Sequence, residues 1–501
     1  MHHLPRLLST LSLALGLASP AVADLTAPQL WQSWNQTAGA MGQTITIGSE
    51  AFADSTLSIR DLAITMPVTD GTVSTTIPYL SLTENGDGSV AITLAPEYDL
   101  HLHMTPAGDE AVDMTMTVAA PGMVTTASGD PDAPAYTYDA PDLRVTLARL
   151  LIDGAPADFD LSFALSQLAG SFAPGTAPDM AFNSRFAAAT MAIAMAGNDL
   201  DDPNATFGLT ASFADIASTG SGTGKGLAAM ADPARLLSSG ARFDGTYSHG
   251  KGQVSATATN PNSGSFSWNS SSDAGRLAAT IGDGVIDYSG TSQGLKMAVS
   301  GDAIPFPTLE AAIEDFGFGF RMPVTRTEAP VDFGLRLNLG GLTAGDFLWG
   351  MVDPDGALPR DPAHLLIDLA GKARLLLDLT NPEAAENMAV PGELQALTLK
   401  ALRLSVAGAE LTGKGGFTFD NSDLTTFDGL PAPEGSVDLQ LVGAAALLDK
   451  LVRMGLLPRD QAQGALFMLG MFTTPSGQDS LSTRIEVTPD GAVSANGQRL
   501  R

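Results

Sequence analysis

The sequence predicts a mainly β protein, with one or more large curved antiparallel sheets, a short N-terminal helix and a C-terminal helical hairpin. Three observations predict this fold class. Apolar and polar residues alternate with a period of two over most of the chain, turn residues separate the alternating segments, and helical periodicity is scarce. With 501 residues, 44% of them hydrophobic, the chain can bury a large core.

Residues 1–23 have the pattern of a secretory signal peptide. A short start containing Arg6 precedes an apolar run from Leu7 to Leu17, and Ala21 and Ala23 form a small-residue cleavage pattern. The apolar run is too short to cross a bilayer, and no later stretch holds about 18 uninterrupted apolar residues. We expect cleavage after Ala23, a soluble periplasmic protein, and no transmembrane segment in the mature chain.

Residues 24–239 form the predicted N-terminal β region. A helix is expected from Thr26, a good N-cap residue, to Met41. Strands with alternating apolar residues follow. The apolar residues occupy odd positions before Arg60-Asp61 and even positions after it, which predicts a β-bulge or tight turn there. The Asn-Gly and Asp-Gly pairs within residues 84–88 lie between alternating runs and predict a hairpin.

Residues 240–302 are rich in Gly, Ser, Thr, Ala and Asn, and turn signals recur about every ten residues. The signals lie at residues 249–250, 260–262, 272–275, 282–284 and 292–294. We interpret this region as a meander of short antiparallel strands. A flexible linker is the alternative, because such composition also marks linkers. Tyr247 and Trp268 favour strands.

Residues 303–501 form the predicted C-terminal β region. Short helical periods predict a helix from Asp346 to Val352 and a helical hairpin from Ala444 to Phe472. Leu365 to Leu379 keep one parity over 15 residues, which predicts a long strand or a tight hairpin near Gly371. The last two expected strands run from Leu481 to Val487 and from Ala492 to Gln498.

Composition excludes several classes of function. With 26 basic and 55 acidic residues, the net charge is −29, which repels nucleic acid and anionic lipid headgroups. The absence of Cys excludes disulfides, a thiolate zinc site and a cysteine nucleophile.

Two short motifs resemble catalytic loops. Gly290 to Gly294 matches the G-x-S-x-G elbow, but the residues after it alternate like a strand, so we interpret it as a hairpin turn. Gly408 to Lys414 fits the start of a phosphate-binding loop, but Gly415 stands where Ser or Thr must bind magnesium, and the pattern is strand to strand. The sequence therefore predicts no reaction and no cofactor, and we expect a non-enzymatic protein.

The candidate metal ligands are Glu97, Asp99, His101 and His103, which alternate with apolar residues. On a strand, all four project from one face, and carboxylates and imidazoles at this spacing can bind a divalent metal such as zinc. The alternative is the solvated face of a half-buried strand. A metal-dependent hydrolase would use these residues.

The C-terminal part resembles an uncharacterised bacterial family, domain of unknown function 2125. The resemblance is carried by Leu456-Leu457-Pro458-Arg459-Asp460-Gln461-Ala462 and by the ending from Val487 to Gln498; Trp31, Trp34 and the segment from Trp349 to Leu379 are similar too. The family implies no established activity, cofactor or site residue. In addition, Ala409 to Phe417 resembles strands of AsmA-like envelope proteins, whose grooved sheets are associated with lipid movement.

Three functions are compatible with this sequence. The first is a periplasmic, non-enzymatic protein of the cell envelope that binds a lipid or other apolar ligand in a sheet groove. The predicted helices are too few to cover so many one-faced strands, so either two sheets close on each other or an apolar channel remains. The channel would be lined by Leu365, Ile367, Leu369, Leu375 and Leu377. The alternatives are an interaction or scaffold protein with a closed β core that meets an envelope protein partner, and the metal-dependent hydrolase.

Overall fold

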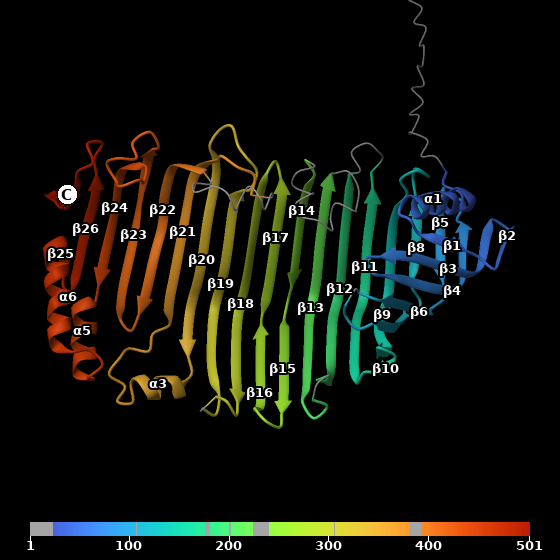
Figure 1. The fold of residues 1–501 in the computed structure, drawn as a ribbon, viewed down its shortest axis with the longest axis horizontal. Helices are drawn as coiled ribbons and strands as arrows, with labels where there is room; N and C mark the ends of the chain where they lie inside the picture. Colours follow the sequence, from blue (N-terminus) through green and yellow to red (C-terminus); the bar gives the residue numbers. More distant parts are fainter. Residues whose placement is uncertain are drawn as a thin grey trace, which may run out of the picture.

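The computed structural model describes residues 24–106, 108–175, 181–199, 202–223, 240–304, 306–379 and 392–501. The predicted signal peptide, residues 1–23, lies outside the described residues. Within them, one antiparallel sheet of 28 strands dominates the structure, and four helices flank it (Figure 1). None of the described helices is long and apolar enough to cross a membrane.

The N-terminal end combines one helix with short, branching strands. β3 pairs with β4, β4 pairs with both β5 and β6, and β9 receives both β7 and β8. The elements are α1 (Ala27–Ala40), β1 (Thr44–Thr46), β2 (Ser49–Ala53), β3 (Thr56–Val68), β4 (Gly71–Glu84), β5 (Ser89–Leu94), β6 (Glu97–Met104), β7 (Val112–Ala119), β8 (Val124–Ser128), β9 (Ala135–Ile152) and β10 (Ala155–Pro156).

The rest of the sheet is a long meander with three helices. Its elements are β11 (Phe159–Pro174), β12 (Phe182–Asn198), β13 (Thr206–Thr223), β14 (Arg242–His249), β15 (Gly252–Asn260), β16 (Gly264–Ser272), β17 (Ala274–Gly282), β18 (Val285–Gly301), β19 (Leu309–Pro323), β20 (Val331–Ala344), α3 (Asp346–Val352), β21 (Ala363–Leu375), β22 (Gly392–Val406), β23 (Ala409–Asp420), β24 (Ala432–Val442), α5 (Ala444–Arg453), α6 (Arg459–Phe472), β25 (Thr474–Gly477), β26 (Ser480–Val487), β27 (Val493–Ala495) and β28 (Gln498–Arg499). The mainly β fold class with terminal helices is confirmed.

The helices begin and end where their capping residues predict. Thr26 caps α1 through a capping box with Gln29, and α3 covers the predicted residues. The predicted C-terminal hairpin is α5 and α6, separated by Gly455 with a φ of 75° and by Pro458 at the N-cap of α6.

The Gly-rich region is ordered and forms short strands, as predicted, but not every break between them reverses the chain. β14 and β15 run in the same direction against β13, one beyond the other, and β16 and β17 do the same against β18. The signals at residues 260–262 and 282–284 are hairpin turns. The signals at 249–250 and 272–275 lie between strands that continue in the same direction, and the signal at 292–294 lies at an irregularity inside β18, so hairpin turns at these three places and the flexible linker were wrong.

We call these irregularities bulges, because at each of them a turn residue, often Asp or Gly, interrupts the alternation of a strand without reversing the chain. Gly294 has a φ of 60° inside β18, where a Cβ would clash with the Asp273 carboxylate. Ser292 is therefore in a strand, and the predicted hairpin turn at Gly290 to Gly294 was wrong, as is any catalytic elbow there. An irregularity is present where the sequence predicts a bulge or tight turn at Arg60-Asp61: the β3–β4 pairing skips Asp61, which has a φ of 51°, and then resumes in the same register.

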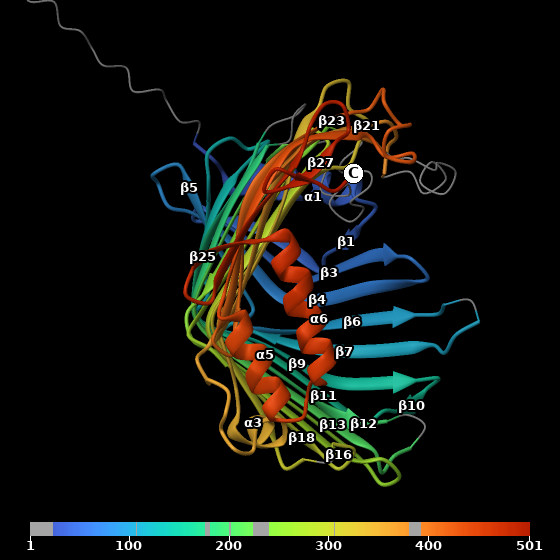
Figure 2. The same cartoon turned by 90° about the vertical axis from the view of Figure 1, so that its left-hand side faces the viewer.

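A line of bulges crosses the centre of the sheet. Gln167, Asp215, Gly294 and Gly341 have φ values of 48°, 52°, 60° and 67°, at neighbouring points where the strand pairing is interrupted and then resumes in the same register. Because a bulge bends its strand, this line helps fold the sheet lengthwise into an open trough, which Figure 2 shows end-on. α1 lies inside the N-terminal end of the trough, and α5 and α6 lie at the other end (Figures 1 and 2).

The N-terminal end contains the main buried cluster. Leu30 and Trp31 of α1 pack with Ile59 and Leu80 of β3 and β4, and three of these four side chains are no more than 1% exposed. The helix is therefore held on the sheet by apolar contacts.

Two predictions about strand ends need correction. The long strand from Leu365 is β21, without a hairpin near Gly371, but it ends at Leu375. The last predicted strand is instead a small hairpin, β27 and β28, because Asn496-Gly497 adopts positive φ values of 49° and 80° and reverses the chain.

A buried carboxylate orders the loop after α3. Asp353 is fully buried, and its side chain accepts hydrogen bonds at 2.8 Å from the backbone N–H groups of both Leu358 and Ala357. The bonds from Leu358 and then Ala357, with the nearby Arg360 charge, hold the pKa of Asp353 below its usual 3.8. The ionised form therefore stabilises the fold above about pH 4, and this contribution is lost as the pH falls through the lowered pKa.

We expect Asp353→Asn to lower the Tm at pH 7, because the amide resembles a protonated carboxyl. The difference from the wild type should shrink as the pH falls below 3.8. Thermal melts of both proteins across this range measure it, and a difference independent of pH would contradict the assignment.

Candidate apolar trough

One face of the sheet is apolar from β9 to β26, and it is the concave face. Apolar residues on neighbouring strands lie opposite one another and form rows across this face. One such row contains Tyr288, Phe320, Leu335 and Leu369. α1 packs on this same face through the Trp34 indole N–H, which donates to the Tyr136 hydroxyl at 2.8 Å.

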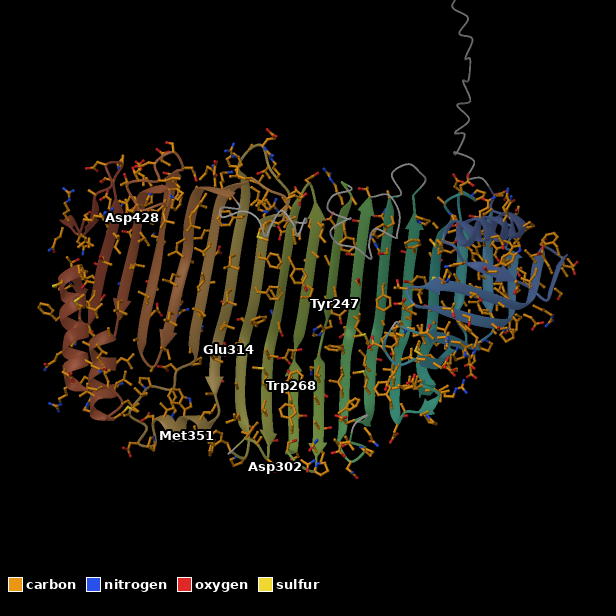
Figure 3. The ribbon with its side chains drawn as sticks, in the orientation of Figure 1. Tyr247, Trp268, Asp302, Glu314, Met351 and Asp428 are labelled. Atoms are coloured by element: carbon orange, nitrogen blue, oxygen red, sulfur yellow. The ribbon has the colours of Figure 1, made fainter. Side chains whose placement is uncertain are left out.

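Figure 3 looks into the trough and shows Tyr247 and Trp268 over the middle of the sheet. Both belong to the apolar rows, since Tyr247 is in register with Leu277, and Trp268 with Val299. The irregularities preserve the face. Phe213 and Ile216 of β13 lie on the same side because Asp215, with a φ of 52°, interrupts the alternation between them, and β12 changes its alternation at the same place, so the register is kept.

Many large side chains of this face remain open to solvent. The apolar-face residues that are more than a third exposed are Phe207, Phe266, Leu277, Phe320, Met322, Leu335, Leu404 and Val406. Fourteen strand positions, from β9 to β26 with β14/β15 and β16/β17 as one position each, make thirteen spacings of about 4.8 Å, or about 60 Å. Apolar patches of this extent usually mark a binding surface.

The trough has almost no charge. In the described strands from β9 to β26, the rows in register on this face contain no Asp, Glu, Lys or Arg. Burial raises the pKa of the Tyr138 and Tyr247 phenols, which therefore stay neutral at neutral pH. The His249 ring lies 4.8 Å from that of Phe213, and its Nδ1 is 2.7 Å from the Gly250 carbonyl oxygen.

Charged groups lie on the outer face instead. Cross-strand ion pairs join Arg321 to Asp287 at 3.0 Å, Arg336 to Asp368 at 3.0 Å and Lys372 to Asp332 at 2.7 Å. Exposed pairs of this kind contribute about 0–1 kcal/mol each, so they mainly keep the outer face hydrated.

The predicted lining residues divide into two groups. Leu365, Ile367 and Leu369 lie in the apolar rows. Leu375 and Leu377 are 9% and 7% exposed, at and beyond the end of β21, where the chain hydrogen-bonds to the segment after β19. These two were wrong as lining residues.

The candidate metal ligands lie elsewhere, on the outer face of β6. The His103 Nδ1 is 2.6 Å from an Asp113 carboxylate oxygen, and the His101 Nδ1 is 3.2 Å from the Thr115 hydroxyl. Asp99 accepts a hydrogen bond at 2.8 Å from Thr117, and Glu97 is exposed. Asp99, His101 and His103 thus each pair with a residue of β7. No group of three or more His, Cys, Asp or Glu in the described part of the chain could hold a metal ion.

Replacing both histidines with Gln, as His101→Gln with His103→Gln, should change the free energy of unfolding by less than about 1 kcal/mol. The reason is that the pair with Asp113 is about half exposed. Denaturant titration measures this change. Stoichiometric zinc in the wild type, lost from the double variant, would contradict it.

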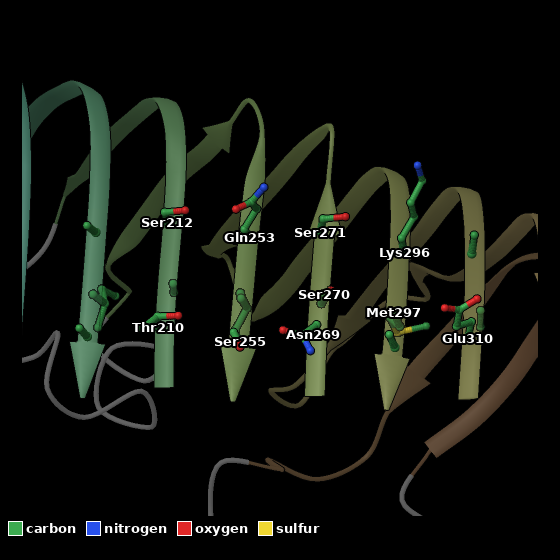
Figure 4. A pocket seen from close by; sticks show the side chains of 18 of the residues that line it. Thr210, Ser212, Gln253, Ser255, Asn269, Ser270, Ser271, Lys296, Met297 and Glu310 are labelled. Atoms are coloured by element: carbon green, nitrogen blue, oxygen red, sulfur yellow. The ribbon is translucent and has the colours of Figure 1, made fainter. Parts of the chain in front are cut away.

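A depression of about 800 Å³ also crosses the outer face (Figure 4). Small polar side chains of β13, β15 and β16 line it, with Lys296 and Glu310 on β18 and β19. It contains no His, and Ser271 lies in register with Lys296 across β16 and β18.

We compared the sequence with models of known protein families. The model of the family described as "Uncharacterized protein conserved in bacteria (DUF2125)" matches residues 210–500, more than half of the chain. The chain belongs to the DUF2125 family.

The DUF2125 match begins within β13 and ends just after β28, so it includes most of the trough and the helices α3, α5 and α6. No curated protein and no solved structure matches the chain. The resemblance to AsmA-like envelope proteins stays a prediction.

Proposed function

We propose that this DUF2125 protein is a non-enzymatic, periplasmic protein of the cell envelope that binds the hydrocarbon chains of lipids in its trough. The observation that supports the proposal is the continuous apolar concave face, which the described elements leave uncovered between α1 and the C-terminal hairpin. Each Å² of apolar surface that a ligand covers contributes about 25 cal/mol.

The chemistry of the trough favours acyl chains over polar ligands. Its rows lack charged residues, so nothing on the floor would neutralise a phosphate or carboxylate. A lipid would therefore lay its chains along the floor and keep its headgroup at the rim, in water. A length of about 60 Å, from the strand spacing, is more than twice that of one extended acyl chain.

The two other functions lack a comparable supporting observation. A scaffold with a closed β core needs a second sheet over the apolar face, and the described strands form a single sheet. A metal-dependent hydrolase needs a third ligand beside His101 and His103, which the described residues do not provide.

Titration with a fluorescent fatty acid such as cis-parinaric acid tests the proposal. We expect saturable binding at more than one equivalent per chain, with competition by unlabelled phospholipid. Absence of saturable binding to the folded protein would contradict the proposed function.

A further inference from the structure

Three helices gather at one corner of the trough, with α3 along a rim and α5 and α6 at the C-terminal end (Figure 1). α3 follows β20, and α5 follows β24, at the rim where β22 turns into β23 (Figure 1). A Cβ built on Gly408, in that turn, would lie 3.1 Å from Pro359 of the loop after α3. One built on Gly443, the N-cap of α5, would lie 3.2 Å from the Cα of Ala409. α3 and α5 are thus linked through a single strand turn.

These helices expose large apolar side chains to solvent. We call this set the apolar rim: Phe347, Met351, Val352, Leu456, Leu466, Phe467, Met468 and Met471, each more than a third exposed. Phe467 is 68% exposed, the highest value among the exposed large hydrophobic residues. Only Ala444 and Ala462 are buried in the hairpin. Packing within the protein therefore does not explain the apolar character of these helices.

The apolar rim is close to electrical balance. Lys450, Arg453 and Arg459 lie around the turn of the hairpin, and Arg360 lies 5.7 Å from the centre of the Trp349 ring. The same helices carry Asp346, Asp449 and Asp460. In a chain with a net charge of −29, these three helices are unusual in carrying as many basic as acidic groups, three of each. The loop after α3 adds Arg360 but also Asp353, Asp355 and Asp361.

The rim is also continuous with the trough. Leu404 and Val406, near the end of β22, are exposed on the apolar face and lead to the Ala407-Gly408 turn beside both helical segments. An apolar surface therefore extends from the trough floor to the helices.

We propose that the apolar rim docks on the surface of a lipid bilayer, with α3 and the α5–α6 hairpin lying in the interfacial region. Amphipathic helices that present Phe, Met and Leu beside Lys and Arg bind there, because the apolar side chains enter the acyl boundary while the long cations reach the headgroups. Docking would let lipid pass between the bilayer and the trough, and this role rests on the proposed function. The proposal that the rim binds a bilayer does not depend on lipid binding in the trough.

Vesicle flotation tests the docking. Mature protein is mixed with phosphatidylcholine vesicles, whose neutral surface does not repel the acidic chain. We expect the wild type to float with the vesicles, also at 1 M NaCl, because apolar insertion is little screened by salt. Phe467→Glu with Met468→Glu should reduce the bound fraction at least tenfold. The matched control, Phe52→Glu with Val124→Glu, changes two exposed apolar residues on β2 and β8 and should float like the wild type.

The outcomes separate docking from trough binding and from other partners. Fatty-acid binding by the rim variant in vesicle-free solution should equal that of the wild type, so loss of flotation alone reports on docking. A wild type that does not float, or a rim variant that floats equally well, overturns the proposal. A dimer in light scattering that the rim variant dissociates, without flotation, would assign the rim to a second copy of the chain and also overturn it.

Discussion

Phe320→Asp combined with Leu335→Asp is expected to weaken the binding of apolar ligands at least tenfold while the protein stays folded. The two residues are in register on β19 and β20, and they are 37% and 51% exposed on the concave face. In the free protein both carboxylates can remain hydrated, so we expect the unfolding free energy to change by less than about 1 kcal/mol. An acyl chain laid across them would remove that hydration without offering a partner, which costs several kcal/mol.

Fatty-acid titration and circular dichroism of the same samples measure both effects. The matched control is Thr291→Asp with Thr398→Asp, which adds the same charge to exposed positions on the outer face. Equal loss of binding in both double variants would show that added charge alone is responsible. Unfolding of the trough variant would instead indicate that this face is covered in the native protein.

Leu30→Ala should have the largest effect on stability, about 2–5 kcal/mol. Leu30 is fully buried between α1 and the sheet, in the cluster that includes Ile59 and Leu80. Removing a buried Leu side chain loses its transfer free energy and leaves a cavity that the sheet fills only in part. Urea unfolding, followed by tryptophan fluorescence because Trp31 and Trp34 lie on the same helix, measures the change.

The control for this variant is Leu466→Ala on α6, where the side chain is 38% exposed. It should cost less than about 1 kcal/mol. Similar losses in the two variants would contradict the conclusion that the N-terminal cluster, and not the C-terminal hairpin, is the stabilising core.

Elements with local signals were predictable from the sequence. Thr26 with Gln29, and Gly455 with Pro458, mark helix ends through hydrogen bonds and backbone angles that involve only near neighbours. Turn residues inside strands were harder to interpret. The residues around Gly250 and Gly294 have the same composition as hairpin turns. Whether the chain reverses there or continues through a bulge depends on how the neighbouring strand pairs with it, which the local sequence does not show.

The trough was predictable only in part. Alternation showed which residues share a face, so Leu365, Ile367 and Leu369 were correctly grouped. It could not show which face is concave or where a strand ends under a neighbouring segment, since both depend on contacts between distant residues. Leu375 and Leu377 were misassigned for this reason. Likewise, the partners of His101 and His103 come from β7, a different strand.

The most direct test of the trough is photo-crosslinking with a phospholipid that carries a diazirine at the end of one acyl chain. Mass spectrometry of the peptides would locate the labelled residues. We predict labels on concave-face residues such as Trp268, Phe320 and Leu335, and none around Ser271 and Lys296 on the outer face. Labels confined to the outer face, or no label at a lipid concentration that saturates fatty-acid binding, would contradict the proposal that lipid chains lie in the trough.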